Sequence, residues 1–481
     1  MKISIGSTLV FATLLIGCDS GAVAGMPTPP DAMPRPAPIS PDGGKNDDVQ
    51  KTQDGDGDNV IDNVDNCLLV ANSDQLDTDA DRLGDACDLD DDNDSVPDDA
   101  DNCLLVANPE QLDGDADKVG DDCVPDAVGP SGTVGAPTEV GTCAALVADG
   151  AQAGKQVTVD SALGFAAGDA VVIHQSRASD GAAAGRYELN TITAVLGNTL
   201  RLRHTLGRAY STGGNDRAQV VRMLPYQDLT VQSGATLSAP AWNGGKCGIL
   251  AIRAAGRVLV ESGGVIDMTG RGFAGGTHHC DLGYDGGGQG ESWNGTGGQS
   301  CGVNAGGGGG GDGVTNAGSE IIPEAGYYNL AASGGGGGYA TAGDPGAGGV
   351  GAGCGGAGGA AGGSYGVTDL AQQMLFGSGG GAGGGNQGWN GWCGRNGGAG
   401  GGLILIVAKG SIEGEGIVRS NGGEASLAAV AGGGGAGGSI RLIAPVVSVG
   451  TEVMGGPSLP LPGGKVGGRG GDGRSLVGSA L

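Results

Sequence analysis

Aspartate recurs at fixed intervals between residues 54 and 126, and the whole pattern then repeats. Each unit is a loop of twelve residues with aspartate at positions 1, 3, 5, 9 and 12. Hard oxygen ligands at these positions, together with the backbone carbonyl of position 7, wrap a short loop around a calcium ion. The sequence therefore predicts an array of calcium-binding loops.

Three loops have the full set of carboxylates, and a fourth lacks one. The predicted ligands of the first loop are Asp54, Asp56, Asp58, Asp62 and Asp65; those of the second are Asp77, Asp79, Asp81, Asp85 and Asp88; those of the third are Asp90, Asp92, Asp94, Asp98 and Asp101. The fourth has Asp113, Asp115, Asp117 and Asp121, but Val124 occupies position 12, where Asp122 or Asp126 could substitute. Position 7 offers only a carbonyl oxygen, from Val60, Leu83, Val96 and Val119.

The spacing of the loops excludes ordinary EF-hands. Loop starts are 23, 13 and 23 residues apart, so a unit of 36 residues repeats and leaves no room for flanking helices. Position 6, where an EF-hand loop needs glycine, holds Asn59, Arg82, Ser95 and Lys118. What recurs instead is Asp-Asn-Cys-Leu-Leu-Val-Ala-Asn, at 65–72 and 101–108, with a second cysteine twenty residues after the first.

This motif resembles the thrombospondin type 3 repeat over about 73 residues. In that family each repeat is mostly loop, wound around calcium ions and pinned by disulfides, which implies Cys67–Cys87 and Cys103–Cys123 here. A disordered acidic tail is the simpler interpretation of a charge run, but random acidity does not keep a 36-residue register. The segment holds 24 Asp and one Glu against Arg82 and Lys118, so we expect it to fold only when cations neutralise it.

The N-terminus predicts export. Lys2 precedes a short apolar run, and Leu15-Ile16-Gly17-Cys18 resembles a bacterial lipobox. The resemblance implies a signal peptide over 1–18, a lipidated Cys18 that holds the chain on a membrane, and a place in the cell envelope, at the outer membrane or cell surface. The rival is ordinary cleavage after Ala24. Both leave ten cysteines, an even number suited to disulfides outside the cytoplasm.

Changes in composition divide the rest of the chain. Residues 19–53 are a proline-rich linker, 54–126 the calcium-binding repeats and 127–138 a second linker. Residues 139–240 are expected to form a β-rich domain with strands at 155–160 and 169–174. A hairpin is expected from 187–195 and 199–206, because apolar and polar residues alternate in its second arm. Residues 241–481 form a glycine-rich head.

Three segments of the head resemble one another, at 248–267, 402–418 and 438–449. Each reads as a strand, a tight turn and one or two more strands, which resembles the coils of a parallel β-solenoid. An antiparallel sandwich is the alternative. The expected fold class is therefore mainly β, a calcium-loop stalk followed by a β-rich cap and a solenoid-like head.

Between the first two coils, residues 269–399 consist largely of glycine runs. Such a run is either a flexible loop or a set of extended glycine helices packed side by side in polyproline-II geometry. Order is favoured by four cysteines and by Trp-Asn-Gly at 242–244, 293–295 and 389–391, and the region resembles the glycine-rich layers of some phage tail adhesins and receptor ectodomains. Three further disulfides are expected among Cys143, Cys247, Cys280, Cys301, Cys354 and Cys393.

Few residues in the sequence indicate an enzyme active site. His278-His279-Cys280-Asp281 is a lone cluster without a second pair of metal ligands. Asp267 and Asp285 are the candidates for a solenoid-borne carbohydrate-active enzyme, a polysaccharide lyase or hydrolase, which is the alternative function. The preferred interpretation is a non-enzymatic surface lipoprotein whose stalk presents the head to a glycan or protein for adhesion or matrix contact. With 25 basic against 53 acidic residues, nucleic acid is not expected as a partner.

Overall fold

The computed structural model describes residues 54–73, 75–79, 81–104, 107–109, 111, 120, 129–277, 288–297, 307–308, 333–347, 359–384 and 395–478. These residues form strands, turns and loops without any helix, and so include none that could cross a membrane. The chain divides into two compact units, Met1–Ser73 and Asp74–Leu481, which are described separately. The expected mainly β fold is confirmed.

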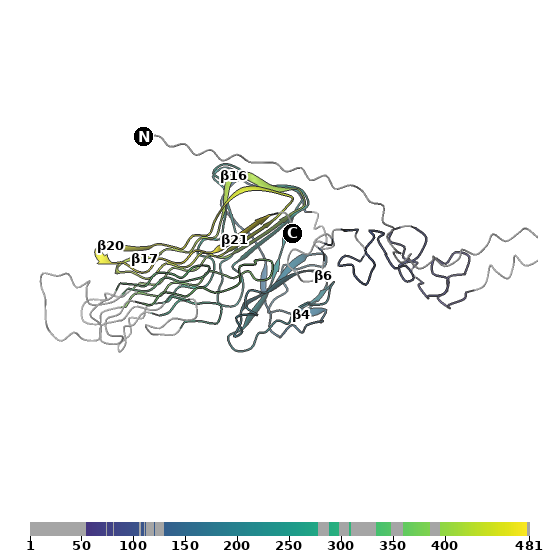
Figure 1. The fold of residues 1–481 in the computed structure, drawn as a ribbon, viewed down its shortest axis with the longest axis horizontal. Helices are drawn as coiled ribbons and strands as arrows, with labels where there is room; N and C mark the ends of the chain where they lie inside the picture. The colour runs from purple at the N-terminus through teal and green to yellow at the C-terminus, as the bar shows by residue number, and fades with distance from the viewer. Residues whose placement is uncertain are drawn as a thin grey trace, which may run out of the picture. The chain divides into compact units, whose positions relative to one another are not determined.

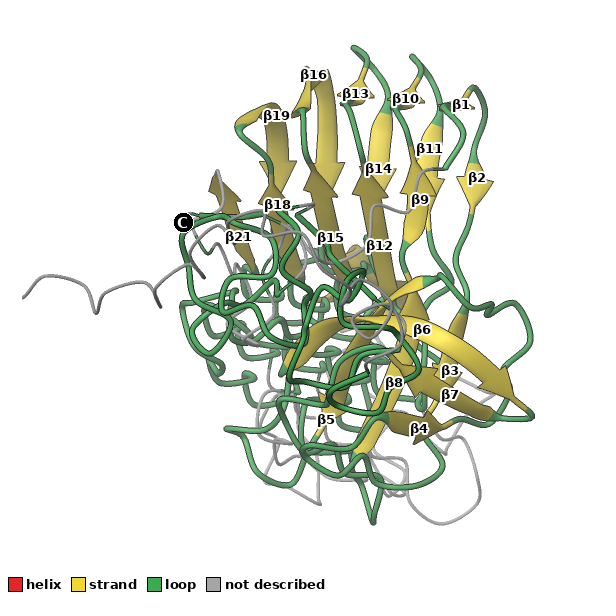
Figure 2. Ribbon diagram, turned by 90° about the vertical axis from the view of Figure 1, so that its right-hand side faces the viewer, coloured by secondary structure: helices red, strands yellow, loops and turns green. Residues whose placement is uncertain are grey.

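Two parallel sheets form the centre of the second unit (Figure 2). The larger, here the outer sheet, comprises β1 (Gly132–Val134), β2 (Thr138–Glu139), β10 (Leu229–Val231), β11 (Thr236–Ser238), β13 (Val258–Val260), β14 (Val265–Asp267), β16 (Ser411–Arg419) and β19 (Val446–Glu452). The smaller, here the inner sheet, comprises β9 (Leu224–Tyr226), β12 (Ile249–Ala254), β15 (Leu403–Ala408), β18 (Ser439–Ile443) and β21 (Arg474–Gly478).

The chain passes from the inner sheet to the outer sheet in every coil, and successive coils stack in register. β12 is followed by β13 and β14, β15 by β16, and β18 by β19. Along the inner sheet Ile249 pairs with Leu403, Leu403 with Ser439, and Ser439 with Arg474, all in parallel. The three similar segments are therefore coils of a parallel solenoid-like fold, and the alternative of an antiparallel sandwich is wrong.

The parallel sheets begin earlier than the boundary drawn from composition. β9, β10 and β11 lie within 139–240, yet they pair in parallel with β12, β13 and β14. β1 and β2 lie at 132–139, across the segment expected to be a linker, and extend the outer sheet. β1, β2 and β10 are only two or three residues long, which is too short to show a periodic pattern of apolar residues.

The three central strands of the inner sheet, β12, β15 and β18, are buried on both faces, which explains why they are almost continuously apolar. On one face Leu250, Ile404 and Ile440 pack against outer-sheet residues such as Val258 and Ile412. On the other face, Ile249, Leu403 and Leu405 contact a second cluster that contains Val172, Leu189, Trp242, Phe273 and Phe376. The sheet thus joins the solenoid core to the rest of the unit.

A six-stranded antiparallel sheet packs beside the solenoid. It comprises β3 (Cys143–Ala145), β4 (Gln156–Thr158), β5 (Ala170–Arg177), β6 (Tyr187–Leu196), β7 (Thr199–Leu202) and β8 (Arg217–Arg222). β6 and β7 form the predicted hairpin, since Leu196 pairs with Thr199 around Gly197 and Asn198. Leu200 and Leu202 are buried in a core with Ile173 and Val220, as the alternation indicates.

Glycine-rich segments pack side by side as an ordered array (Figure 1), with β17 (Ala425–Val430) and β20 (Ser458–Lys465) among them. The six consecutive amides of 433–438 donate hydrogen bonds of 2.8–3.0 Å to carbonyls of three neighbouring segments. Gly433 donates to Gly381 and Ala436 to Ser378 of one segment, and Gly434 donates to Gly468 and Gly437 to Gly471 of the second. Gly435 donates to Gly423 and Gly438 to Ser420 of the third. Every third amide faces the same neighbour, which is the period of a polyproline-II helix.

The close approach of these segments requires glycine. A Cβ atom on Gly434 would lie 1.9 Å from the carbonyl oxygen of Gly456, and one on Gly435 would lie 2.0 Å from that of Ala399. The described part of the glycine-rich region is therefore an ordered layer, as the second interpretation of its sequence expects. Segments that connect the later coils, such as residues 433–438, also belong to the array, although they lie outside residues 269–399.

The first Trp-Asn-Gly tripeptide anchors the insertion to the solenoid. Trp242 donates from its indole Nε1 to both carboxylate oxygens of Glu291 at 3.0 Å, and Glu291 also forms a buried ion pair with Arg177 at 2.7 Å. A disulfide joins Cys143 of β3 to Cys247, just before β12. Cys280, Cys301, Cys354, Cys393 and the third tripeptide lie outside the described residues.

Candidate functional site

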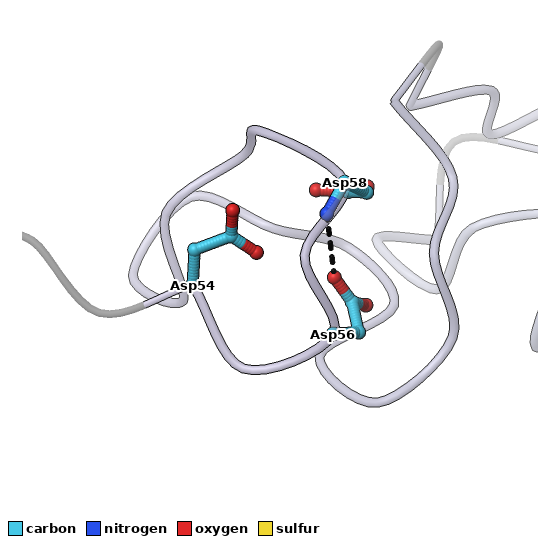
Figure 3. Close-up of side chains that lie close together, drawn as sticks. All are labelled: Asp54, Asp56 and Asp58. Carbon is cyan, nitrogen blue, oxygen red and sulfur yellow. Dashed lines mark hydrogen bonds between the residues drawn. The ribbon is translucent and has the colours of Figure 1, made fainter.

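The first three aspartate loops each bring their carboxylates at positions 1, 3 and 5 together. In the first unit, Asp54, Asp56 and Asp58 each offer an oxygen atom, and these atoms lie within 4.8 Å of one another (Figure 3). The same clustering holds in the second unit for two further triads, Asp77 with Asp79 and Asp81, and Asp90 with Asp92 and Asp94. Nine of the predicted ligands therefore lie where a single ion per loop could contact three of them.

The same backbone hydrogen bonds hold each triad in place. The position-1 carboxylate accepts a hydrogen bond from the backbone amide of position 6. Asn59 donates to Asp54 at 3.1 Å, Arg82 to Asp77 at 3.1 Å and Ser95 to Asp90 at 3.0 Å. The position-5 carboxylate accepts from the amide of position 7, from Val60, Leu83 and Val96, at 2.7–2.8 Å. The second oxygen atoms of Asp54 and Asp90 also accept a backbone amide, from Gly57 at 2.8 Å and from Asp94 at 3.1 Å. An ionised carboxylate has about four lone-pair sites, so the folded loop still leaves acceptor capacity for a cation.

The aspartates at positions 9 and 12 are placed differently. At position 9, Asp62, Asp85 and Asp98 accept from the amide of position 2 at 2.7–3.0 Å, which closes the loop. At position 12, Asp65 and Asp101 accept from the amides of Cys67 and Cys103 at 2.9 and 2.7 Å, and Asp88 accepts from Leu89 at 2.6 Å. Within the described loops these carboxylates thus shape the backbone, and the three-oxygen clusters do not include them.

Position 6 has a left-handed backbone in every described loop. The φ angles of Asn59, Arg82 and Ser95 are 77°, 85° and 78°. This region favours glycine because a Cβ crowds the backbone there, and asparagine tolerates it better than arginine or serine does. The loops therefore bend as an EF-hand loop does at its glycine, although none of them has glycine at that position.

Several buried oxygen atoms in the triads have no hydrogen-bond partner: Asp56 Oδ2, Asp77 Oδ1 and Asp92 Oδ2. Burial, followed by the neighbouring carboxylates, raises the pKa of Asp92 above its ordinary value. Buried unpaired acceptors close to like charges are costly unless a cation neutralises them. The donor set is entirely oxygen, which suits a hard divalent ion such as calcium or magnesium.

Two asparagines that the sequence reasoning did not single out support the triads. The amide of Asn72 donates to Asp58 Oδ2 at 2.8 Å, and the amide of Asn108 donates to Asp94 Oδ2 at 2.7 Å. Both side chains are buried and donate to an earlier asparagine of the same motif, Asn66 or Asn102. Their recurrence at the end of Asp-Asn-Cys-Leu-Leu-Val-Ala-Asn is the signal that could have found them.

Asp91 is a further carboxylate that the loop positions did not predict. Its side chain is 6% exposed, and its Oδ1 atom has no hydrogen-bond partner. Burial, then the charges of Asp98, Asp85 and Asp88, raises its pKa to about 6. Asp91 therefore belongs electrostatically to both the second and the third loop.

Other predicted sites have mixed outcomes. Cys67, Cys87 and Cys103 are each disulfide-bonded, while the two pairings stay predictions. Asp267 forms an ion pair with Arg419 at 2.7 Å; burial raises its pKa, but hydrogen bonds from Arg419 and Thr269 outweigh this and lower it overall. Outside the described residues lie Cys18, Cys123, the fourth-loop residues 113, 115, 117, 119 and 121, the 278–281 cluster and Asp285.

Comparison with protein families supports the identity of the repeats. The thrombospondin type 3 repeat model matches residues 76–111, which contain the second and third loops. That stretch is similar to a thrombospondin type 3 repeat. The match supports this part of the resemblance, and the carboxylate clusters, which could hold a metal ion, agree with it.

Solved structures give weaker likenesses. The Gp54 tailspike of Acinetobacter baumannii bacteriophage AP22, solved with A. baumannii capsular saccharide, is 14% identical over 30% of this chain and 26% of the tailspike, with a TM-score of 0.16. The gp61 tailspike of Pseudomonas phage phi297 is 18% identical over 30% and 23%, with a TM-score of 0.17. The chain thus matches about a quarter of each tailspike's length, and no functional conclusion follows. No curated protein matches the sequence.

Proposed function

We propose that the chain is an exported, calcium-binding surface protein, in which the aspartate loops form a calcium-stiffened stalk. The observation that carries the proposal is the repeated carboxylate triad with buried oxygen atoms that lack a partner. Calcium accepts six to eight oxygen ligands in flexible geometry, whereas magnesium demands a near-ideal octahedron. Magnesium is usually held by one or two carboxylates and several waters, so a loop with three clustered carboxylates suits calcium better than magnesium.

The parts beyond the loops complete the proposal. Cys18, in its lipobox-like context, carries a lipid that holds the chain on the outer membrane or cell surface. The solenoid and the glycine array form a head that contacts a glycan or matrix protein by binding rather than catalysis. The ion pair of Asp267 with Arg419 ties two outer-sheet strands together, which supports a structural role for that carboxylate.

Calorimetric titration of the full chain with calcium tests the metal site, with Asp92→Ala as the variant. Asp92 belongs to the third triad, and alanine offers no side-chain oxygen, so we expect this variant to lose about one bound ion. Asp99→Ala is the matched control, because Asp99 is exposed and lies outside the ligand positions. Loss of no ion in Asp92→Ala, or equal binding of magnesium and calcium by the unchanged chain, would contradict the proposal.

Intact-mass spectrometry of membrane-extracted protein tests the anchor. The expected mass includes a diacylglyceryl adduct on Cys18 as the first residue. A mature N-terminus at Gly25, produced by cleavage after Ala24, would show the anchor to be wrong while leaving the calcium site untouched.

A further inference from the structure

The head contains a pocket that no pattern in the sequence indicates. Its cavity has a volume of about 680 Å³ and is lined by residues that include Arg186, Arg208, Trp293, Tyr365, Gln372 and Gln373. Pockets of about 300–1,000 Å³ are typical of sites for small molecules. We call it the arginine pocket.

Two separate parts of the fold build this pocket. Arg186 lies immediately before β6 of the antiparallel sheet, whereas Trp293 and Tyr365 come from the glycine-rich insertion. The parts are fastened where they meet: Gln373 donates to the carbonyl of Ala182 at 2.7 Å, and the amide of Met374 donates to the carbonyl of Gly185 at 2.9 Å. The walls are therefore preformed rather than assembled by a ligand.

The charge of the lining has one sign. Among the residues that the structure describes, the lining includes two arginines and no carboxylate. Arg186 is partly buried and has no ion-pair partner among the residues that the structure describes. The nearest acid in sequence, Glu188, is buried outside the lining of the pocket and accepts from the amide of Gly207 at 3.0 Å. Asp180 and Asp369 are exposed and accept from the amides of Ala182 and Ala371, both at 2.9 Å. In a chain of net charge −28, an unpaired arginine in a cavity favours an anionic ligand.

The remaining lining residues indicate which class of anionic molecule fits the pocket. The rings of Trp293 and Tyr365 lie with their centroids 6.5 Å apart and are both partly exposed. Aromatic rings present a broad apolar face, onto which the C–H face of a sugar ring can stack. Gln372 is exposed beside them and offers an amide that both donates to and accepts from hydroxyl groups.

We propose that the arginine pocket binds an acidic saccharide, with Arg186 paired to a sugar carboxylate and the two rings against the sugar. This rests on the proposed function of the head as a glycan-binding part and specifies the class of glycan. A carboxylate matches the planar fork of a guanidinium through two parallel hydrogen bonds. An acidic peptide is the competing class of ligand, and it offers the carboxylate without a ring to stack.

The first experiment is binding of the full chain to a panel of neutral and uronic-acid-containing oligosaccharides. Calorimetry then compares an oligogalacturonate with the galactose oligosaccharide of the same linkage, which differs only in lacking the carboxylates. We expect the acidic ligand to bind at least about ten-fold more tightly, since charge-assisted hydrogen bonds contribute about 1.5–3 kcal/mol. A glutamate oligopeptide serves as the peptide arm.

Variants locate the site. Arg186→Gln is expected to weaken oligogalacturonate binding about ten-fold or more, with Arg186→Lys intermediate because a point charge cannot form the bidentate pair. Arg203→Gln removes the same charge from an exposed position outside the pocket, and binding by this variant should stay within about two-fold of the unchanged chain. Trp293→Leu is expected to weaken binding of the acidic and the neutral ligand alike. Thermal unfolding confirms that each variant is folded.

The outcomes separate the two proposals. Binding of neutral glycans only, binding of the peptide in preference to the uronate, or uronate binding that Arg186→Gln leaves unchanged would overturn the arginine pocket and leave a glycan-binding head standing. Binding of no glycan in the panel would overturn both. Selective uronate binding that falls in Arg186→Gln and persists in Arg203→Gln supports the site.

Discussion

At the scale of single residues, the aspartate loops combine candidate ligands that could be predicted with supporting residues that could not. Positions 1, 3 and 5 follow from spacing alone, because loop position determines where a carboxylate points. The roles of Asn72, Asn108 and Asp91 depend on contacts with other segments, such as the amide of Asn72 on Asp58, which no local pattern shows. The carboxylates at positions 9 and 12 accept backbone amides, as those at positions 1 and 5 do, but they lie outside the three-oxygen clusters, and their role as ligands stays a prediction.

The left-handed residue at position 6 gives a prediction with a built-in control. Arg82 has a φ angle of 85°, where a side chain costs about 1–2 kcal/mol that glycine avoids. Arg82→Gly should therefore raise the unfolding free energy of the calcium-bound repeats by about 1 kcal/mol, measured by denaturant titration. Arg82→Ala removes the same charge but keeps Cβ; if it stabilises the repeats as much as glycine does, charge and not backbone strain is responsible.

His174 predicts a pH dependence for the head. It is fully buried, its Nε2 lies 2.8 Å from the carbonyl of Met374 and its Nδ1 lies 2.9 Å from the hydroxyl of Ser176. Burial lowers its pKa to about 4, although the carbonyl of Met374 acts in the opposite direction. Between pH 4 and the ordinary pKa of 6.5, His174 binds a proton in the unfolded chain but not in the folded one. The contribution of the neutral, buried His174 to the free energy of unfolding is therefore complete above pH 6.5 and is lost as the pH falls toward 4.

The integrated effect at His174 is about 3 kcal/mol. Thermal unfolding of the head at pH 7, 5.5 and 4 would measure it, with His174→Gln as the variant that removes the titrating group. The stability of the variant should depend less on pH over this range. Equal pH slopes in the two proteins would show that other groups cause the loss.

At the scale of elements, strands were predicted wherever apolar residues formed runs long enough to show a period. β12, β15 and β18 were found because their strands recur with the same turn after each. β1, β2 and β10 were missed because strands of two or three residues carry no period and take their structure from the neighbouring coil. The sequence could not decide whether the glycine-rich region is a flexible loop or an ordered array. The three-residue period of the array lies in the neighbouring segment that each amide contacts, and these contacts leave no pattern in the sequence.

The array predicts strong dependence on particular glycines. Gly435→Ala would place a Cβ atom 2.0 Å from the carbonyl oxygen of Ala399, a backbone atom that cannot rotate away. We expect a loss of about 3 kcal/mol or more in the unfolding free energy, measured by denaturant titration. Gly213→Ala is the control, because no heavy atom lies within 4 Å of its Cβ position, and it should change stability by less than about 0.5 kcal/mol. An equally mild effect at Gly435 would contradict the packed array.

At the scale of the whole molecule, the charge and the apolar residues are separated along the chain. Most of the net charge of −28 lies at 54–126, where large apolar side chains such as Leu69 and Leu89 are exposed rather than packed. The solenoid and its neighbouring sheet hold the buried cores. Folding of the repeats is therefore expected to depend on cations, whereas folding of the head depends on apolar burial.

Hydrogen exchange followed by mass spectrometry on the full chain, with calcium and with chelator, tests this division most directly. Chelator should remove amide protection from the loops at 54–101, including the amides of Asn59, Arg82 and Ser95. Protection in β12, β15 and β18 should stay unchanged. Loop amides that are equally protected with calcium, with magnesium and with chelator would contradict the central claim that calcium folds the repeats.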